Sequence, residues 1–317
     1  MRVIVPERAV EYLRSNIPAI TSLANLLVID RNGDGDEVAD ADALFLWGLS
    51  AEGLDRVLTA APKLRWIHTV SAGVDRVIRP EMLQRGITLT NSSGIHSVPI
   101  AEWVMAVMLA EAKHLRELNA AQRERRWIKA DLRLNELAGK TILILGLGDI
   151  GRAVAQRAAA FAMRVWGTRR RREPVPGVER VFGPDEWRSA LPEADYLVVT
   201  LPLTGRTRRL IGAAEFAALK PGAWIINIAR GEIIDEPALI DALQHGHLGG
   251  AALDVFEQEP LPAESPLWGF DHVFVSPHIS WSSPRIQERA ATLFLENLRR
   301  YCRGEALLNV VDLEAGY

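Results

Sequence analysis

Three glycines in the middle of the chain have the spacing that binds the pyrophosphate of a dinucleotide. Gly146, Gly148 and Gly151 follow the apolar residues 142–145 and precede a stretch of helical periodicity at 153–161. The first glycine permits a tight turn, the second lets a pyrophosphate approach the backbone, and the third lets the helix lie close to the strand. Amides at the start of that helix then point at the phosphates. The pattern predicts a nucleotide-binding strand, turn and helix, with a purely structural turn as the alternative.

The residues after the next apolar run distinguish between two dinucleotides. If the cofactor is NAD, the strand at 164–168 should end in an acid, because a carboxylate accepts hydrogen bonds from the ribose hydroxyls. The chain has arginines at 169–172 instead, and guanidinium groups match the oxygens of a 2′-phosphate. We therefore expect NADP, held near Thr168 by Arg169 and Arg170, with NAD as the alternative cofactor. A solvated basic loop is the structural alternative.

Three further polar runs follow apolar stretches in the C-terminal half. They are residues 227–231, 254–260 and 276–280, which contain Arg230, Glu259 and His278 respectively. Because parallel strands present their carboxyl ends at one edge of a sheet, we expect all three runs to open on the same rim. Taken singly, each side chain has a structural reading as an ion pair, a surface acid or a capped loop histidine.

Length and composition describe an ordinary globular protein. The 317 residues suit two domains, and 48% hydrophobic with 24% charged residues is a usual balance. A net charge of -3 gives no electrostatic reason to expect nucleic acid or an anionic membrane as a partner. The single cysteine, Cys302, excludes an intrachain disulfide. With no signal peptide or membrane span legible and no metal-ligand cluster, we expect a cytoplasmic protein without a metal.

Two α/β units are legible in the order of apolar runs and helical segments, and each is typical of a parallel sheet with helices on both faces. A helix that is apolar all round, at 100–110, follows the first unit, and a long helix is expected at 284–302 with Ser283 as its N-cap. The predicted strands lie at 3–5, 26–29, 43–47, 66–70 and 87–90 in the first unit, and at 142–145, 164–168, 196–200, 223–228, 250–255 and 273–276 in the second.

Loops after two strands of the first unit are candidates for ligand binding. One contains Leu46 and Trp47, and the other is the run 70–75, which includes Ala72, Gly73 and Val74. Open α/β sheets bind ligands at such strand ends, and a turn with consecutive free amides can hold a carboxylate. A plain turn explains either loop equally well.

The ordered motifs together resemble those of the D-isomer-specific 2-hydroxyacid dehydrogenases, a family that includes glyoxylate and hydroxypyruvate reductases. The resemblance extends over nearly the whole chain and implies two doubly wound α/β domains, with a Rossmann domain inserted in a flavodoxin-like substrate domain. We place the Rossmann domain at 99–282 and the substrate domain at 1–98 plus 283–317. The matching motifs are 71–75, 91–102, the glycine turn at 146–151, 201–204 with Thr207, 227–231, 254–260 and Pro277 with His278.

This resemblance implies NAD(P)H-dependent reduction of a 2-oxo acid to the D-2-hydroxy acid in a cleft between the domains. Arg230 would bind and polarise the substrate with its two-pronged guanidinium. His278 would donate the proton that converts the alkoxide left by hydride transfer into the hydroxyl group. Glu259 would stabilise the protonated histidine and fix its ring. Amides of Ala72, Gly73 and Val74 would bind the substrate carboxylate.

Further contacts are also implied by the resemblance. Trp281 is bulkier than the residue expected from the family, so with Leu46 and Trp47 it is predicted to line an apolar substrate pocket. The cofactor contacts implied are Asp149, Ile150, Leu201, Pro202, Thr207, Ile228, Ala229, Asp254 and His278.

Other readings of the same motifs stay open. A nucleotide-sensing, corepressor-like binding protein would bind the cofactor without turnover. A 3-phosphoglycerate-type dehydrogenase is another alternative. A formate dehydrogenase fits less well, because the resemblance implies a glutamine paired with the histidine in those enzymes, where this chain has Glu259. The family also suggests a homodimer formed through the buried helix near Trp103 to Leu109.

Overall fold

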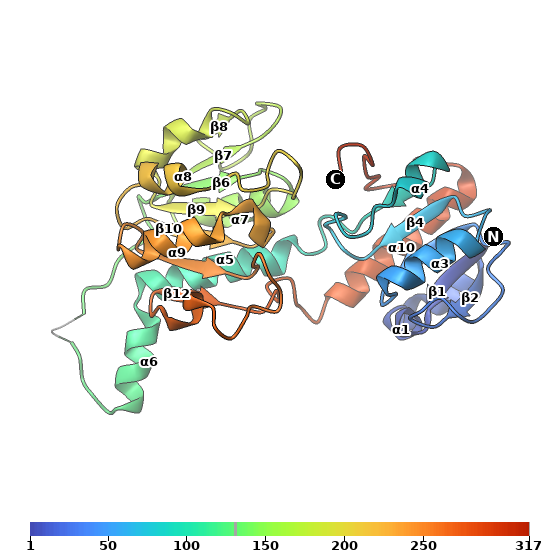
Figure 1. Ribbon diagram of the computed structural model, residues 1–317, viewed down its shortest axis with the longest axis horizontal. Helices are drawn as coiled ribbons and strands as arrows, with labels where there is room; N and C mark the ends of the chain where they lie inside the picture. Colours follow the sequence, from blue (N-terminus) through green and yellow to red (C-terminus); the bar gives the residue numbers. More distant parts are fainter. Residues whose placement is uncertain (130–131, 317) are drawn as a thin grey trace. The chain divides into compact units, whose positions relative to one another are not determined.

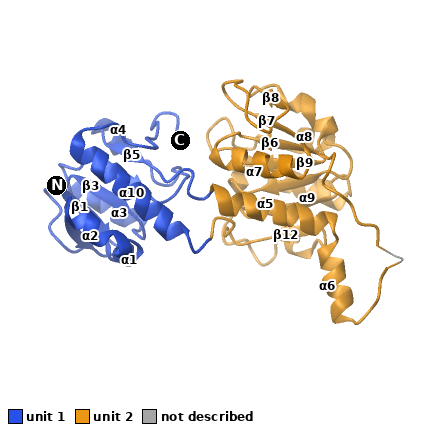
Figure 2. Cartoon of the chain, turned by 180° about the vertical axis from the view of Figure 1, so that it is seen from behind, with its two compact units in different colours: residues 1–96, 283–317 blue, residues 97–282 orange. Residues whose placement is uncertain are grey.

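The computed structural model describes residues 1–129 and 132–316 (Figure 1). The chain divides into two compact units (Figure 2). Unit 1 consists of Met1–His96 and the chain from Ser283 onward, and unit 2 is the intervening Ser97–Ser282. One unit is therefore inserted into the other.

Unit 1 is built on a parallel sheet with the strand order β2-β1-β3-β4-β5, which is the flavodoxin-like order. Side chains alternate across the sheet: Ile4, Leu44 and Ile67 pack on α3, whereas Phe45 and Trp66 lie against Phe294 of α10. Helices thus cover both faces. The elements are β1 (Arg2–Pro6), α1 (Glu7–Tyr12), α2 (Ile17–Thr21), β2 (Asn25–Ile29), β3 (Ala43–Leu46), α3 (Ala51–Ala60), β4 (Trp66–Thr69), α4 (Pro80–Gln84), β5 (Thr88–Thr90) and α10 (Ile286–Arg303), with a 3-10 turn at Arg14–Asn16.

Unit 2 has the strand order β12-β11-β10-β9-β6-β7-β8, with parallel neighbours throughout. Counted within the unit, its first six strands follow the Rossmann order, and the order reverses between β6 and β9, where such sheets bind ligands. The elements are α5 (Ser97–Ala112), α6 (Leu115–Arg123), β6 (Thr141–Leu145), α7 (Asp149–Ala160), β7 (Arg164–Thr168), β8 (Arg180–Phe182), β9 (Tyr196–Val199), α8 (Ala213–Ala218), β10 (Trp224–Asn227), α9 (Glu236–Gln244), β11 (Gly250–Leu253) and β12 (Val273–Val275), with 3-10 turns at Trp187–Glu193, Gly231–Ile233 and Pro266–Gly269.

Two apolar layers hold the sheet of unit 2 between helices. Leu143 and Leu197 face the layer that contains Phe216 of α8 and Leu239 of α9. Their neighbours along the strands point to the other face, where the layer is formed with α5 and α7. Helix α5, which the sequence indicates is apolar all round, buries most of its residues in this layer, whereas Val98, Glu102 and Ala106 are exposed.

The predicted fold class is confirmed, and two details differ. Strand β8 at Arg180–Phe182 was not predicted, because three residues that begin with an exposed arginine carry no apolar run. The last helix begins at Ile286, not at Pro284, because Ile286 N donates to Ser283 O and closes a turn ahead of the helix. Ser283 Oγ accepts from Arg285 N within that turn.

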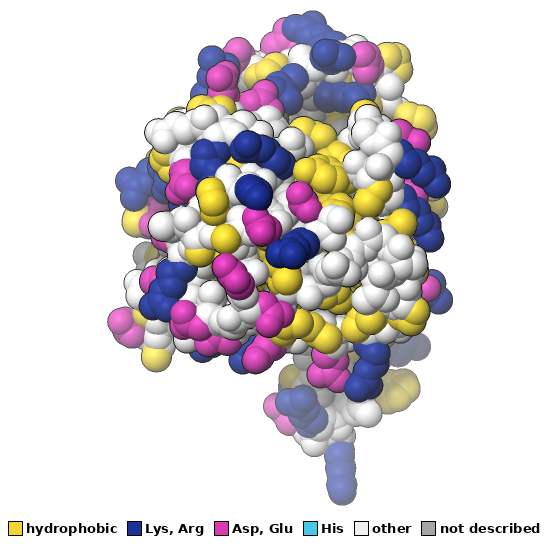
Figure 3. Space-filling view, turned by 90° about the vertical axis from the view of Figure 1, so that its right-hand side faces the viewer, with side chains coloured by type: hydrophobic (Ala, Val, Ile, Leu, Met, Phe, Trp, Pro, Cys, Tyr) yellow, Lys and Arg dark blue, Asp and Glu magenta, His cyan; other side chains and the backbone are white. Residues whose placement is uncertain are grey.

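The surface in Figure 3 carries Lys and Arg side chains interspersed with Asp and Glu. Within the part of the chain that the structure describes, no helix combines the length and the apolar character that crossing a bilayer requires.

Candidate active site

A histidine and a glutamate meet at the carboxyl edge of the unit 2 sheet. His278 follows β12 and Glu259 lies in the loop after β11, with His278 Nδ1 3.0 Å from Glu259 Oε2. The second carboxylate oxygen, Oε1, accepts from the amide of Phe256 at 3.3 Å. Because Nδ1 faces the carboxylate, Nε2 points to the opposite side of the ring, where it can donate a proton to a bound molecule.

The loop that carries His278 is held by Asp254, a buried residue that follows β11. One oxygen of its carboxylate accepts from Ile279 N at 2.8 Å and also from Ser276 Oγ, and the other accepts from Ser280 N at 3.0 Å. His278 itself has a left-handed backbone conformation, with a φ of 54°. These bonds on both sides of the histidine hold it in a conformation that non-glycine residues seldom adopt.

Arg230 enters the same edge from the loop after β10. Asn227 shapes that loop, since its amide group donates to Arg230 O at 3.0 Å and accepts from Ala229 N at 3.1 Å. The next residue, Gly231, packs so closely on the loop of Glu259 that a Cβ would lie 1.9 Å from the carbonyl carbon of Phe256. The three predicted catalytic residues therefore come from loops that either pair directly or touch through their main chains.

The glycine turn has the shape that a pyrophosphate requires. Gly146 has a φ of 104°, and a Cβ on Gly151 would lie 2.0 Å from Gly146 O, so both positions need glycine. Gly148 faces open space, and α7 begins after it without a side-chain cap. The amides of the first helical turn are thus left for an anion, and these residues fit the phosphates of a dinucleotide.

Two threonines support this turn. Thr168 Oγ1 accepts from Gly146 N at 2.8 Å, and Thr200 Oγ1 donates to Gly146 O at 2.6 Å. Neither Thr200 nor Asn227 is among the predicted site residues, although Asn227 begins the predicted polar run 227–231. The signal available for both is a polar residue that closes an apolar strand at the ligand-binding edge.

Arginines follow β7, as the sequence predicts. Arg169 Nη1 lies 3.2 Å from Glu173 Oε2, and Arg172 pairs with Glu186. The side chain of Arg169 is about one third exposed, at 32%. A 2′-phosphate at the end of β7 would therefore compete with Glu173 for this guanidinium.

The remaining predicted cofactor contacts lie around the same edge. Thr207 Oγ1 donates to Pro202 O at 2.6 Å and so shapes the loop after β9, which also contains Leu201. Ile228 and Ala229 are buried directly after β10. At the start of α7, Asp149 Oδ1 is 2.5 Å from Arg152 Nη2, and Ile150 packs on the apolar core. As nucleotide contacts, these residues and Asp254 stay predictions.

The predicted substrate residues belong to both units. In unit 1, Leu46 is buried at the end of β3, and the centroid of the Trp47 ring lies 5.1 Å from the centroid of the Tyr12 ring. In unit 2, Trp281 Nε1 donates to His278 O at 2.8 Å, and its ring packs on the core below. Trp281 is thus a support for the histidine loop, and its role in a substrate pocket stays a prediction.

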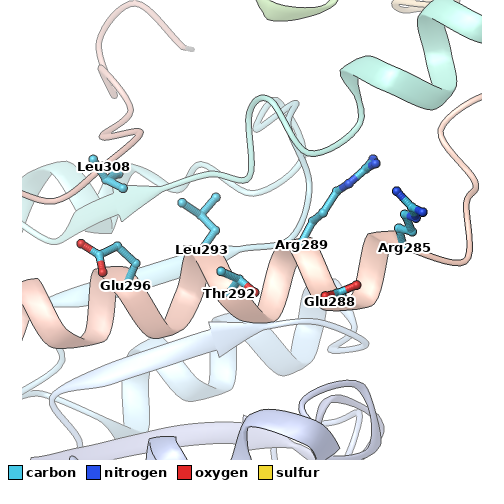
Figure 4. A pocket seen from close by; sticks show the side chains of 7 residues that line it. All are labelled: Arg285, Glu288, Arg289, Thr292, Leu293, Glu296 and Leu308. Atoms are coloured by element: carbon cyan, nitrogen blue, oxygen red, sulfur yellow. The ribbon is translucent and has the colours of Figure 1, made fainter.

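A surface groove in unit 1 lies elsewhere and contains none of the predicted site residues (Figure 4). It runs along α10. Its lining residues are Arg285, Glu288, Arg289, Thr292, Leu293, Glu296 and Leu308. Among the residues at 1–129 and 132–316, no group of three or more His, Cys, Asp or Glu side chains is arranged to hold a metal ion.

A nucleotide-binding turn beside an arginine and an acid-paired histidine defines a dinucleotide-dependent oxidoreductase. The family model described as D-isomer specific 2-hydroxyacid dehydrogenase, NAD binding domain, matches residues 105–280, which is more than half of the chain. The chain belongs to the D-isomer-specific 2-hydroxyacid dehydrogenase family. The family predicted from the sequence motifs is therefore confirmed.

Glyoxylate reductases and D-3-phosphoglycerate dehydrogenases are both among the relatives of this chain. Glyoxylate reductase from Korarchaeum cryptofilum is 36% identical over 288 residues, which cover 88% of this chain and 85% of that protein. D-3-phosphoglycerate dehydrogenase from Methanocaldococcus jannaschii is 36% identical over 286 residues, covering 88% of this chain but 53% of that protein. The chain thus spans about half the length of that phosphoglycerate dehydrogenase.

Solved structures resemble the whole chain. A D-isomer specific 2-hydroxyacid dehydrogenase from Xanthobacter autotrophicus, in complex with NADPH and MES, matches with a TM-score of 0.86 and 34% identity, covering 99% of both chains. An NADPH-dependent glyoxylate/hydroxypyruvate reductase from Sinorhizobium meliloti, in complex with NADP and sulfate, matches with a TM-score of 0.87 and 29% identity over 100% of this chain and 99% of that one.

Proposed function

We propose that this enzyme reduces a 2-oxo acid to the corresponding D-2-hydroxy acid, with NADPH as the preferred cofactor. The observation that carries the proposal is the His278–Glu259 pair at 3.0 Å, with the loop of Glu259 packed against the loop of Arg230. An acid-paired histidine beside an arginine matches the needs of a substrate that carries a carboxylate next to a carbonyl.

Each residue has a separate task in this proposal. Arg230 binds the carbonyl oxygen and the carboxylate with its planar guanidinium, which orients the carbonyl and draws electron density from its carbon. The reduced nicotinamide supplies the hydride when it is bound. His278 donates a proton from Nε2 to the oxygen of the substrate, and Glu259 stabilises the positive charge of the ring before that transfer.

The basic residues after β7 support NADPH as the cofactor. Arg169 and Arg170 follow the strand where a dinucleotide places its adenine ribose, and a guanidinium binds a phosphate where a carboxylate would repel it. The similar structures from Xanthobacter autotrophicus and Sinorhizobium meliloti contain NADPH and NADP respectively. We propose that Arg169 binds the 2′-phosphate in place of Glu173.

Small 2-oxo acids of the glyoxylate and hydroxypyruvate type are the proposed substrates. Two similarities support this class. The glyoxylate reductase from Korarchaeum cryptofilum matches over 85% of its own length, and the glyoxylate/hydroxypyruvate reductase from Sinorhizobium meliloti matches over 99% of its chain. A larger 2-oxo acid stays within the proposal, because the half-buried Trp47 offers apolar surface directly after β3.

The test is a panel of glyoxylate, hydroxypyruvate, pyruvate, phenylpyruvate and 3-phosphohydroxypyruvate, each assayed with NADPH and with NADH. We expect oxidation of NADPH with at least one of the first four acids, and a D-configured product by chiral chromatography. Binding of NADPH without turnover of any acid would replace the proposal with a nucleotide-sensing protein. Preference for 3-phosphohydroxypyruvate would reassign the substrate.

We further propose that the enzyme is a cytoplasmic homodimer that associates through α5 and the adjoining α6. Leu115 and Leu118 of α6 are 43% and 38% exposed, and a helix with exposed leucines gains stability when a partner covers them. Light scattering of the purified protein should give twice the mass of one chain. A monomer at micromolar concentration would contradict the dimer.

A further inference from the structure

Four consecutive carbonyl groups at the end of β4 are all bound by one short segment of unit 1, Asn91–His96. Ser92 Oγ donates to Thr69 O at 3.0 Å, and Ser92 N donates to Ser71 O at 3.1 Å. His96 Nε2 is 3.2 Å from Val70 O, and Asn91 Nδ2 donates to Ala72 O at 2.8 Å. The carbonyls of residues 69–72 therefore all have partners in this one segment.

A buried histidine, His68 of β4, fixes the direction of this network. Its Nε2 is 3.2 Å from Ser92 Oγ, which already donates its proton to Thr69 O, so Nε2 is the donor to Ser92. Its Nδ1 then accepts from Thr90 Oγ1 at 2.8 Å, and Trp66 Nε1 donates to the same hydroxyl at 2.9 Å. Burial lowers the pKa of His68 to about 3, which keeps the ring neutral as this pattern requires.

The segment Asn91–His96 is itself anchored from the C-terminal part of unit 1. Asn309 Nδ2 donates to Ser93 O at 2.9 Å, and Asn309 O accepts from Asn91 N at 3.1 Å. Arg289 points from α10 toward the backbone after β5, where its Nη1 donates to Ile95 O at 3.1 Å (Figure 4). The segment is thus a rigid support, held from two sides.

The amides of the supported loop are left for a ligand. Within the part of the chain that the structure describes, no group accepts a hydrogen bond from the amide of Ala72, Gly73 or Val74. The loop is accessible at Ser71, which is exposed, and at Ala72 and Gly73, which are half-buried, whereas the Val74 side chain is buried. Successive free amides in a turn form a site for an anion.

We infer that His68 and the segment Asn91–His96 are positioning residues that set the affinity of the enzyme for the substrate carboxylate. This inference rests on the proposed function, because it assigns the carboxylate of the 2-oxo acid to the amides of residues 72–74. Binding the carbonyls of Ser71 and Ala72 fixes the peptide planes that carry the amides of Ala72 and Gly73, so these amides are aligned before the substrate arrives.

The test compares two buried asparagines of unit 1 that make the same pair of bonds. Asn91 donates to Ala72 O and accepts from Ser93 N, whereas Asn297 donates to Leu308 O and accepts from Leu308 N. Asn91→Ala and Asn297→Ala should both lower the melting temperature. Only Asn91→Ala should raise KM for the 2-oxo acid, by about tenfold, with KM for NADPH unchanged.

A second probe separates this inference from the proposed reaction. Calorimetry measures the binding of oxamate, a non-reducible carboxylate of similar size, to the NADPH-saturated protein. We expect Asn91→Ala to weaken oxamate binding about tenfold and Asn297→Ala to leave it unchanged. If the wild type binds oxamate but reduces no 2-oxo acid, the proposed function fails and the oxamate comparison still decides the positioning role.

Equal affinity of wild type and Asn91→Ala for oxamate would overturn the inference, and so would a wild type that does not bind oxamate. Should Asn91→Ala fail to fold, His96 provides the second comparison. His96→Gln keeps an N–H group that can donate to Val70 O and should retain the affinity for oxamate. His96→Leu has no such group, and its affinity for oxamate should fall about tenfold. Equal binding by these two variants would also contradict the inference.

Discussion

His278 Nδ1 lies 3.0 Å from Glu259 Oε2, and this contact predicts a catalytic defect in Glu259→Gln. A neutral amide stabilises a protonated imidazole less than a carboxylate does, and a charge-assisted bond contributes about 1.5–3 kcal/mol. We therefore expect kcat to fall roughly ten- to hundredfold, measured by oxidation of NADPH under saturating substrate. Glu257→Gln is the matched control, because Glu257 pairs with Arg209 at 3.7 Å instead. Equal kcat in the two variants would contradict the role of Glu259.

Asp254→Asn is predicted to damage catalysis through the loop of His278. The carboxylate accepts bonds from Ile279 N and Ser280 N. An asparagine has one carbonyl oxygen, so it can accept one of these bonds, and its NH2 group then faces the other backbone N–H. The unfolding free energy should drop by about 1–3 kcal/mol, and kcat should fall at least tenfold. Urea unfolding and steady-state kinetics measure the two effects. A variant that is destabilised yet retains wild-type kcat would show that Asp254 only holds the fold.

Substitutions of Arg169 and of Glu173 should change KM for NADPH in opposite directions. Arg169→Ala removes a guanidinium from the proposed 2′-phosphate site, so KM for NADPH should rise about ten- to hundredfold while KM for NADH stays the same. Glu173→Gln frees Arg169 from an exposed ion pair, which contributes about 0–1 kcal/mol, so KM for NADPH should fall about twofold. A parallel change with both cofactors in Arg169→Ala would exclude a phosphate-specific role.

His68 predicts a loss of stability in mild acid. Its pKa is about 3 in the folded protein, because burial disfavours the charged ring, and about 6.5 in an unfolded chain. Below pH 6.5 the unfolded state binds a proton that the native state does not, so stability falls as pH falls toward 3. From pH 7 to pH 5 this one residue should cost about 2 kcal/mol of unfolding free energy.

The comparison for His68 is with His68→Gln, which has no group that titrates in this range. Burial also lowers the pKa of His96, but that contribution is common to both proteins and cancels. Urea unfolding at pH 7 and pH 5 should therefore show a larger loss in the wild type than in His68→Gln. Identical pH dependence in the two proteins would mean that His68 is protonated in the folded state.

Local patterns predict most of the fold because they are encoded by neighbours in the sequence. The apolar run before Gly146 is a strand in the structure, and Gly151 lies against Gly146 as its spacing requires. Strand β8 was missed because its pairing with β7 at Trp166 and Gly167, not its own composition, makes it a strand. The start of α10 was misplaced because a turn through Ser283 competes with the helix.

Supporting contacts are harder to predict, since they depend on the register between segments far apart in the chain. The sequence indicates Arg230, Glu259 and His278, each of which follows an apolar strand. That Asp254 holds the histidine loop follows only from the pairing of β11 with β12. The four bonds from Asn91–His96 likewise arise because β4 and β5 lie side by side. No local pattern in either segment predicts that pairing.

The most direct measurement is the rate of NADPH oxidation in a single turnover, compared between the wild type and His278→Ala with the best 2-oxo acid of the panel. The account predicts normal binding of NADPH and a rate lower by roughly 10²–10⁴-fold, the usual contribution of a positioned proton donor. Wild-type turnover by His278→Ala would contradict the assignment of His278 as the proton donor and with it the proposed site.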